Sequence, residues 1–221
     1  MRVFISGGAK NGKSTFAQRM AKKIAKRNET QIAKRIEGQI PKQNEERSAF
    51  GSAMAQPAAG APLYYVATMR AADNEDDERI KRHRAERDGW GFSTIEQPVD
   101  IEKILERCDC GGTFLLDSLT ALLANEMFLP PDWRLNERAA DKVVEGLSQV
   151  LKTVCNIVVV SDFIYSDAVI YDPLTEKYRK FLAQIDRAAV EGCDVVLEAA
   201  FANIIVHKGK EEYERFCETL A

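Results

Sequence analysis

Residues 7–14 have the residue types and the spacing of a phosphate-binding loop. The segment reads Gly-Gly-Ala-Lys-Asn-Gly-Lys-Ser, a glycine followed by four residues and then Gly12, Lys13 and Ser14. In such a loop backbone N–H groups turn toward phosphate oxygens, the lysine reaches the terminal phosphates, and the hydroxyl ligates Mg²⁺. We expect Lys13 to act in catalysis and Ser14 to hold the metal. The expected nucleotide contacts in this loop are Gly7, Gly8, Ala9, Lys10, Asn11, Gly12, Lys13 and Ser14.

The elements on either side of this loop match the same interpretation. Residues 3–5 form an apolar run typical of a buried strand, and Phe16, Met20 and Ile24 recur at helical spacing within residues 15–27. A loop between a strand and a helix gains the positive end of the helix dipole, which attracts phosphate. The sequence therefore predicts a nucleoside triphosphate site at the start of the chain.

Two acidic residues follow apolar strand patterns and are candidate partners of the bound metal. Residues 114–116 end at Asp117, and residues 158–160 are followed by Ser161 and Asp162. A carboxylate in this place holds Mg²⁺ directly or through water, although an acidic residue after a strand also often caps a helix. We expect Asp117 to be the catalytic and metal-side carboxylate. Asp162 is the second choice or a base acting on the substrate, and Asp162 and Thr68 are expected to contact the nucleotide.

Strand and helix patterns alternate along the chain. Strands are predicted at residues 63–68, 92–95, 113–116, 157–160, 195–197 and 204–206, and helices at residues 74–87, 101–108, 119–128, 136–153 and 176–191. This alternation predicts an α/β fold of the P-loop NTPase (RecA-like) kind, a mostly parallel sheet with helices on both faces. We expect one domain over residues 1–221, with Gly7, Thr68, Asp117 and Asp162 at the carboxyl edge of the sheet.

An insertion is expected at residues 28–62, which are polar and then rich in Ala, Gly and Pro. Residues 30–40 can continue the first helix, but Gly38 and Pro41 would end it. We favour a mobile surface loop, and the alternative is a lid that orders over the substrate.

A charged segment at residues 73–84 holds a second group of candidate residues. On a helix, Glu75, Arg79, His83 and Arg87 recur every four residues and share one face. One interpretation is a solvated helix stabilised by opposite charges. The other makes His83 a nucleophile toward phosphorus, with arginines neutralising the developing phosphate charge. Composition leaves both interpretations open.

The overall composition favours a small-molecule partner. The formal net charge is −3 with no basic stripe, so nucleic-acid binding has little electrostatic support. We predict no membrane span and a cytoplasmic location, because no apolar run is long enough to cross a bilayer. The five cysteines have irregular spacing, which suits reduced core thiols and does not predict a zinc site.

Several segments together resemble the bifunctional adenosylcobinamide kinase/adenosylcobinamide-phosphate guanylyltransferase family of cobalamin biosynthesis. They are the phosphate loop, the run Tyr-Val-Ala-Thr at residues 65–68, Glu75 with Arg79 and His83, and Leu-Leu-Asp-Ser-Leu-Thr at residues 115–120. The resemblance implies ATP or GTP as co-substrates with Mg²⁺, and phosphorylation of adenosylcobinamide. It also implies transfer of GMP from GTP through a phosphoramidate on His83, giving adenosylcobinamide-GDP, and a possible homotrimer.

Later segments depart from the family pattern. Ser-Asp-Phe-Ile at residues 161–164 stands where the family usually has Asn-Glu-Val-Gly, and residues 183–187 replace a Gly-x-x-Asn-Gln pattern. Two other functions are therefore kept open. One is a P-loop small-molecule kinase without guanylyl transfer, and the other is a nucleotide-dependent binding protein without turnover.

Overall fold

The computed structural model describes residues 1–37, 62–70, 78, 81, 85, 87–131, 133–167, 169–201 and 203–218. The candidate residues Glu75, Arg79 and His83, and most of the predicted insertion, lie outside these described residues.

Seven strands form one sheet in the order β3-β2-β4-β7-β1-β8-β9. Every neighbouring pair is parallel except β8 and β9, which form an antiparallel hairpin at one edge. The strands are β1 (Arg2–Gly7), β2 (Leu63–Ala67), β3 (Ser93–Glu96), β4 (Thr113–Asp117), β7 (Asn156–Asp162), β8 (Val195–Ala200) and β9 (Asn203–Lys208). Two short strands, β5 (Phe128–Leu129) and β6 (Arg134–Leu135), form a separate ribbon.

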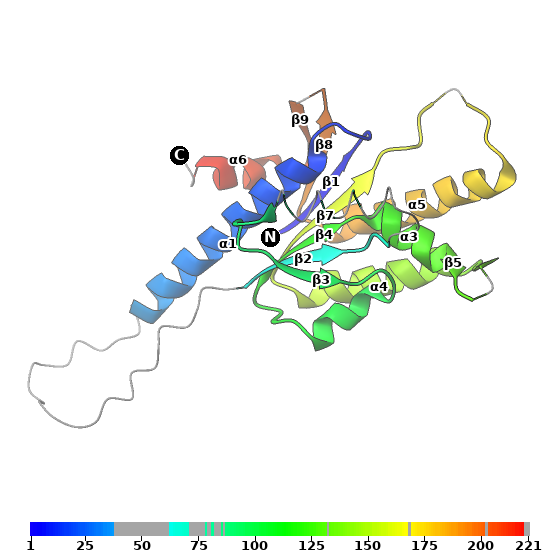
Figure 1. The fold of residues 1–221 in the computed structure, drawn as a ribbon. Coiled ribbons are helices and arrows are strands. Elements are labelled where there is room, and N and C mark those ends of the chain that lie inside the picture. The colour runs from blue at the N-terminus through cyan, green and yellow to red at the C-terminus, as the bar shows by residue number, and fades with distance from the viewer. Residues whose placement is uncertain are drawn as a thin grey trace, which may run out of the picture.

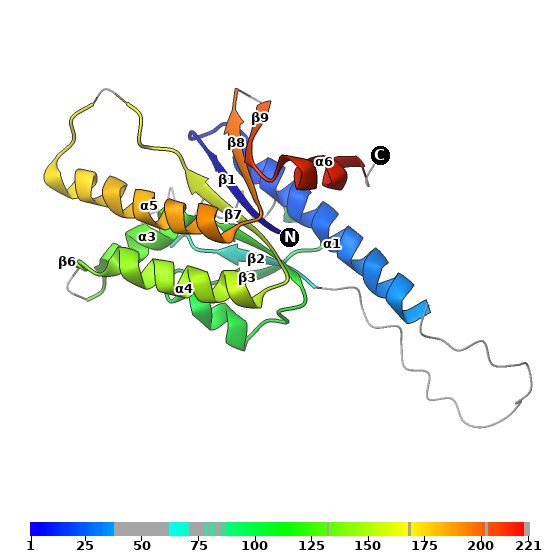
Figure 2. The same ribbon diagram turned by 180° about the vertical axis from the view of Figure 1, so that it is seen from behind.

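Helices cover both faces of the sheet (Figures 1 and 2). One face carries α1 (Lys13–Glu37) and α6 (Lys210–Glu218), and the other carries α3 (Leu119–Met127), α4 (Ala139–Thr153) and α5 (Pro173–Gly192). A 3₁₀ helix, η1 (Ile101–Glu106), packs against α4. The central strands bury side chains on both faces, as their continuous apolar runs require. The prediction of a mostly parallel α/β sheet covered on both faces is confirmed.

Two hydrophobic cores result, one on each face. Between the sheet and α1 lie Ile5, Met20, Leu115, Val158 and Val160, among others, whereas Phe4, Phe114, Leu116, Ile157 and Val159 join the core beneath α4 and α5. Successive side chains of a strand point to opposite faces, so within each strand the odd-numbered and even-numbered residues lie on different sides of the sheet. This alternation places the polar residues at the strand ends on defined faces.

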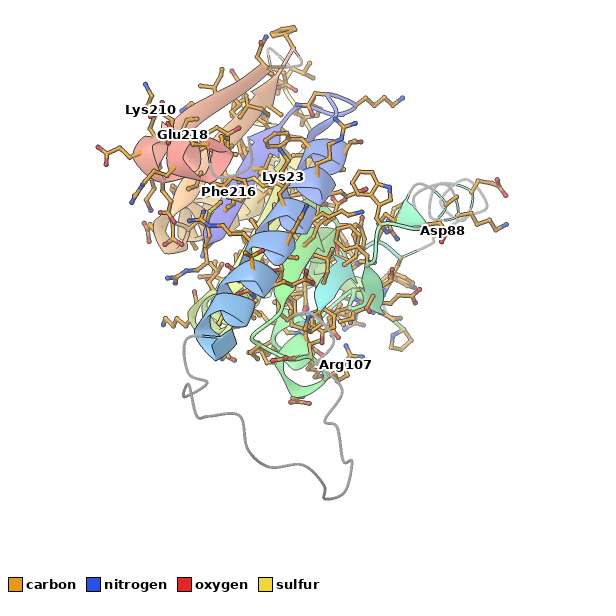
Figure 3. The ribbon with its side chains drawn as sticks, turned by 90° about the vertical axis from the view of Figure 1, so that its left-hand side faces the viewer. Lys23, Asp88, Arg107, Lys210, Phe216 and Glu218 are labelled. Carbon is orange, nitrogen blue, oxygen red and sulfur yellow. The ribbon has the colours of Figure 1, made fainter. Side chains whose placement is uncertain are left out.

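The ends of the sequence differ from the prediction. Helix α1 continues to Glu37, so the first ten residues of the predicted insertion at residues 28–62 are helical. Helix α6 was not predicted, because its charged sequence buries a single residue, Phe216. Figure 3 shows α6 beside α1, where Phe216 completes the core on that face.

Candidate active site

The loop after β1 is shaped by close backbone approaches at its first glycine. A Cβ atom at Gly7 would lie 2.3 Å from Asn11 Nδ2 and 2.5 Å from the Ala199 carbonyl oxygen, so no larger residue fits. The Asn11 amide donates a hydrogen bond to that carbonyl, and its Oδ1 accepts one from the Lys13 backbone N–H at 3.1 Å. Gly12 has φ of +84°, a conformation that favours glycine. These contacts fix the loop predicted to hold phosphate.

Lys13 is the first residue of α1, and only 9% of its side chain is exposed. Its Nζ donates a hydrogen bond to the Gly8 carbonyl at 3.1 Å and lies 2.5 Å from Asp162 Oδ1. The ammonium group is therefore held over the loop by one backbone oxygen and one carboxylate. The amino end of α1 adds its positive dipole at the same place.

Strand register brings the two acidic candidates to the carboxyl edge of the sheet. Asp162 lies opposite Gly7, and Asp117 lies opposite Ala67 and Val160. Parity places both carboxylates on the α1 face, the face of the phosphate loop. The expectation that Gly7, Asp117 and Asp162 meet at this edge is confirmed. Asp162, on the strand next to β1, is the carboxylate that contacts Lys13.

Thr68 reaches the same edge, but its hydroxyl is engaged within the protein. This fully buried side chain donates a hydrogen bond to the Ser118 carbonyl and accepts one from the Ser118 N–H, both at 2.8 Å. The Asn125 amide donates to the Thr68 carbonyl at 2.7 Å. Thr68 therefore joins the end of β2 to the turn after Asp117. Its predicted contact with the nucleotide stays a prediction.

Two residues that the sequence reasoning did not assign to the site lie next to it: Tyr65 contacts Asp117, and Arg87 contacts Tyr65. The Tyr65 hydroxyl donates a hydrogen bond to Asp117 Oδ2 at 2.8 Å. The guanidinium carbon of Arg87 lies 3.6 Å from the centre of the Tyr65 ring. The alternation of β2 could have indicated Tyr65, because residues 65 and 67 face the same side as Asp117.

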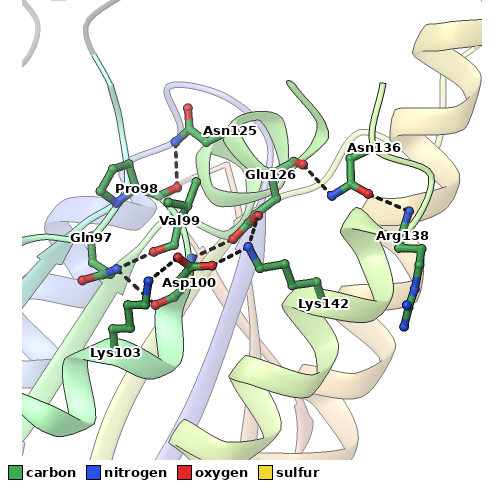
Figure 4. Close-up of polar contacts among 10 residues, drawn as sticks. All are labelled: Gln97, Pro98, Val99, Asp100, Lys103, Asn125, Glu126, Asn136, Arg138 and Lys142. Carbon is green, nitrogen blue, oxygen red and sulfur yellow. Dashed lines mark hydrogen bonds and ion pairs between the residues drawn. The ribbon is translucent and has the colours of Figure 1, made fainter. Parts of the chain in front are cut away.

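The loop after β3 is tied to the helices of the opposite face by charged residues (Figure 4). Glu126 of α3 is almost fully buried; it accepts a hydrogen bond from the Asp100 N–H at 2.7 Å and another from Lys142 Nζ at 2.8 Å. Lys142 also forms an ion pair with Asp100. These bonds give the buried carboxylate its partners. They hold the loop beside Asn125, which binds Thr68.

A buried carboxyl group lies behind β7 on the α5 face. The Tyr165 hydroxyl donates a hydrogen bond to Asp186 Oδ2 at 2.7 Å. Burial raises the pKa of Asp186 to about 6; the hydroxyls of Tyr165 and Ser161 oppose this shift, and the carboxylate of Asp162 adds to it. Among the described residues, Asp186 Oδ1 and Ser161 Oγ are buried without a hydrogen bond of normal geometry. The face of β7 opposite the phosphate loop therefore carries a carboxyl group with a pKa of about 6.

We expect Asp186→Asn to stabilise the protein above pH 6. An unfolded Asp ionises near pH 3.8 and the folded residue near pH 6, so the native state binds more protons and loses stability as pH rises between these values. The difference corresponds to about 3 kcal/mol well above pH 6, where both states are ionised, and a neutral amide carries no such charge penalty. Urea unfolding at pH 8 and pH 5 should give the variant a larger advantage at pH 8. An advantage that is equal at both pH values would contradict this account.

The residues present suit Mg²⁺ bound largely through a nucleotide. No group of three or more His, Cys, Asp or Glu side chains able to hold a metal occurs in the part of the chain that the structure describes. Mg²⁺ commonly takes one or two protein oxygens and completes its octahedral shell with phosphate oxygens and water. The Ser14 hydroxyl and the Asp117 carboxylate are hard oxygen donors of this kind, and their role as ligands stays a prediction.

The fold and this edge of the sheet define a P-loop α/β protein, in which a strand, a glycine-containing loop and a helix beginning with Lys13 follow one another. The family described as "Cobinamide kinase / cobinamide phosphate guanyltransferase" (CobU) matches residues 46–202. The chain belongs to this family. The resemblance inferred from the sequence is thereby confirmed.

Individual relatives are more distant. The chain is 27% identical over 198 residues to the bifunctional adenosylcobalamin biosynthesis protein CobP of Pseudomonas aeruginosa, covering 89% of this chain and 91% of that protein. A KaiC-like protein of Pyrococcus horikoshii OT3 aligns over 94% of this chain and 78% of its own, with 12% identity and a TM-score of 0.43. A second protein from that organism aligns over 94% of this chain and 85% of its own, with 11% identity and a TM-score of 0.42.

None of the described helices is long and apolar enough to cross a membrane.

Proposed function

We propose that this protein phosphorylates adenosylcobinamide with ATP or GTP and then transfers GMP from GTP to the phosphorylated product through His83. Membership of the cobinamide kinase/guanylyltransferase family supports the reaction class. The observation that carries the kinase half is the buried Lys13 ammonium, fixed 2.5 Å from Asp162 above a loop in which only glycine fits at position 7. Such a lysine is placed to meet the negative charge of a triphosphate.

In the kinase step, an acceptor hydroxyl oxygen forms a bond to the γ-phosphorus while the bond to the β–γ bridging oxygen breaks. The backbone of residues 7–14 would hold the phosphates, and Lys13 would neutralise charge on the transferred group. Mg²⁺, when held by Ser14 and Asp117, supplies further neutralisation of the phosphate oxygens. Asp162 would orient Lys13. Its carboxylate is also a candidate base for the proton of the acceptor hydroxyl.

In the guanylyl step, a ring nitrogen of His83 would attack the α-phosphorus of GTP, and pyrophosphate would leave. The phosphate of adenosylcobinamide phosphate would then attack the same phosphorus and release the histidine. Dividing one displacement into two makes each barrier smaller. Glu75 and Arg79, which with His83 recur every four residues, are proposed to bind the nucleotide in this step.

Exposed apolar side chains in the segments that follow β7 and β8, the two strands beside β1, suit a large, partly apolar acceptor such as adenosylcobinamide. Ile170, in the loop between β7 and α5, is 97% exposed, and Phe201, at the tip of the β8–β9 hairpin, is 95% exposed. Both segments rise from the carboxyl end of the sheet (Figure 1). Phe163 begins the first of them and donates its N–H to the Gly7 carbonyl at 2.9 Å.

A kinase without guanylyl transfer is the second candidate. Residues 161–164 and 183–187, which contain Asp162 and Asp186, depart from the pattern of the bifunctional family, and this departure favours a protein with one of the two activities. Under this alternative Gly12, Lys13, Ser14 and Asp117 remain essential, whereas His83 is dispensable.

Labelling with ATP and GTP in parallel, with and without adenosylcobinamide, tests the proposal. We expect γ-labelled nucleotide to transfer its label to adenosylcobinamide, and α-labelled GTP to leave a label on the protein that is acid-labile and base-stable. Transfer of the γ-phosphate without any protein label would favour the kinase alone. Nucleotide binding with neither transfer would favour a binding protein.

A further inference from the structure

Tyr65 connects the metal-side carboxylate to the strand that bears the Tyr-Val-Ala-Thr run. Its register partner on β4 is Leu115, two residues before Asp117, and all three side chains lie on the α1 face of the sheet. The tyrosine hydroxyl therefore reaches along the sheet surface to Asp117 Oδ2, where it donates a hydrogen bond of 2.8 Å. One carboxylate oxygen is engaged by this bond.

The tyrosine ring is held tightly by its neighbours. Tyr65 is 5% exposed, and the Phe92 ring packs edge-on against it, with centroids 5.9 Å apart and planes at 86°. The buried Arg87 guanidinium covers a ring face at 3.6 Å from the centroid. A cation in this position is attracted to the aromatic ring. Packing on both the edge and the face leaves the hydroxyl little freedom to change direction.

This arrangement places a cation on the Tyr65 ring and a neutral hydrogen-bond donor on Asp117. An arginine bound directly to the carboxylate would compete with a divalent metal for its oxygens. Here the guanidinium contacts the ring, and the neutral phenol donates to Asp117. The donor orients the carboxylate through Oδ2 and leaves its negative charge available to a metal.

We propose that Tyr65 is a positioning residue that orients the Asp117 carboxylate toward nucleotide-bound Mg²⁺, with Arg87 holding the tyrosine ring. This inference rests on the proposed function, which makes Asp117 the metal-side carboxylate. Groups that hydrogen-bond a metal ligand commonly change metal affinity by about 10–100-fold when they are removed.

The test is the Mg²⁺ dependence of nucleotide binding, measured by the fluorescence of mant-ATP without any turnover. Tyr65→Phe keeps the ring and its packing but removes the hydroxyl. We expect the Mg²⁺ concentration for half-maximal binding to rise about 10-fold, with binding of mant-ATP in EDTA unchanged. Tyr64→Phe is the matched control. It removes the hydroxyl of the preceding residue, whose side chain faces the opposite side of the sheet and whose hydroxyl accepts a hydrogen bond from the Asp109 N–H. This control should behave as the wild type.

Asp117→Asn separates the failure of this inference from the failure of the metal assignment. A raised Mg²⁺ requirement in Asp117→Asn but not in Tyr65→Phe would overturn the positioning role alone. An unchanged requirement in Asp117→Asn would remove Asp117 from the metal site and overturn the inference with it. Weaker binding of mant-ATP in EDTA by Tyr65→Phe would identify a general structural effect, which also overturns the positioning role. The double variant Tyr65→Phe/Asp117→Asn should require no more Mg²⁺ than Asp117→Asn.

Discussion

Replacement of His83 by Asn is expected to abolish covalent labelling of the protein by α-labelled GTP while leaving γ-phosphate transfer to adenosylcobinamide largely intact. The asparagine side chain is close in size but offers no ring nitrogen to attack phosphorus, so no phosphoramidate forms. The described contacts of Lys13 in the phosphate loop are made with Asn11, Gly8 and Asp162. Quantification of the acid-labile, base-stable label per protein chain, beside the rate of γ-phosphate transfer, measures both effects.

The chain offers a matched control because it contains two histidines. The other, His207, lies on the edge strand β9 with its Nε2 2.7 Å from Glu198 Oε2. His207→Asn should keep the full label. If the label persists in His83→Asn and disappears in His207→Asn, then His83 is not the nucleophile. If both variants are labelled, the attachment is not a histidine phosphoramidate.

The central sheet could be predicted from the sequence because its strands are short apolar runs buried on both faces, bounded by polar residues and separated by amphipathic helices. Residues 114–116 and 158–160 are clear examples, and both fall inside observed strands. Helix α6 was missed because it buries Phe216 alone, which produces no apolar periodicity. The first helix ends at Glu37, in line with the prediction that residues 30–40 can continue it until Gly38, whereas the favoured mobile loop was wrong for residues 28–37 because these largely polar residues remain helical.

The site was predicted in part, since sequence patterns give the order of strand ends but not the contacts among side chains. The rule that parallel strands end at one edge correctly brought Asp117 and Asp162 together. It could not indicate that Asp162, rather than Asp117, contacts Lys13, because that depends on strand order: β7 lies between β1 and β4. Tyr65 was missed for a similar reason. Its hydrogen bond to Asp117 joins residues 52 positions apart.

The second large effect is expected from Lys13→Met, which should slow γ-phosphate transfer by about 10²–10³-fold, or about 3–4 kcal/mol of transition-state stabilisation. Methionine fills much of the lysine volume but removes the charge that opposes the phosphate. Because Lys13 is buried against Asp162 and the Gly8 carbonyl, no exposed cation can occupy its place. Single-turnover transfer of γ-label to adenosylcobinamide measures the loss. Lys23→Met, on the exposed surface of α1, is the control that should retain the wild-type rate.

The same measurement decides between the two roles open to Asp162. If its carboxylate acts by orienting Lys13, then Asp162→Asn slows transfer in the wild type but adds almost nothing in the Lys13→Met background, because residues that act through one another are not additive. If it accepts the proton of the acceptor hydroxyl, its loss slows transfer in both backgrounds by similar factors. The distance of 2.5 Å between Lys13 Nζ and Asp162 Oδ1 leads us to expect the first result. Additive losses would instead assign Asp162 as the base, and a wild-type rate in Lys13→Met would remove the loop lysine from the kinase step.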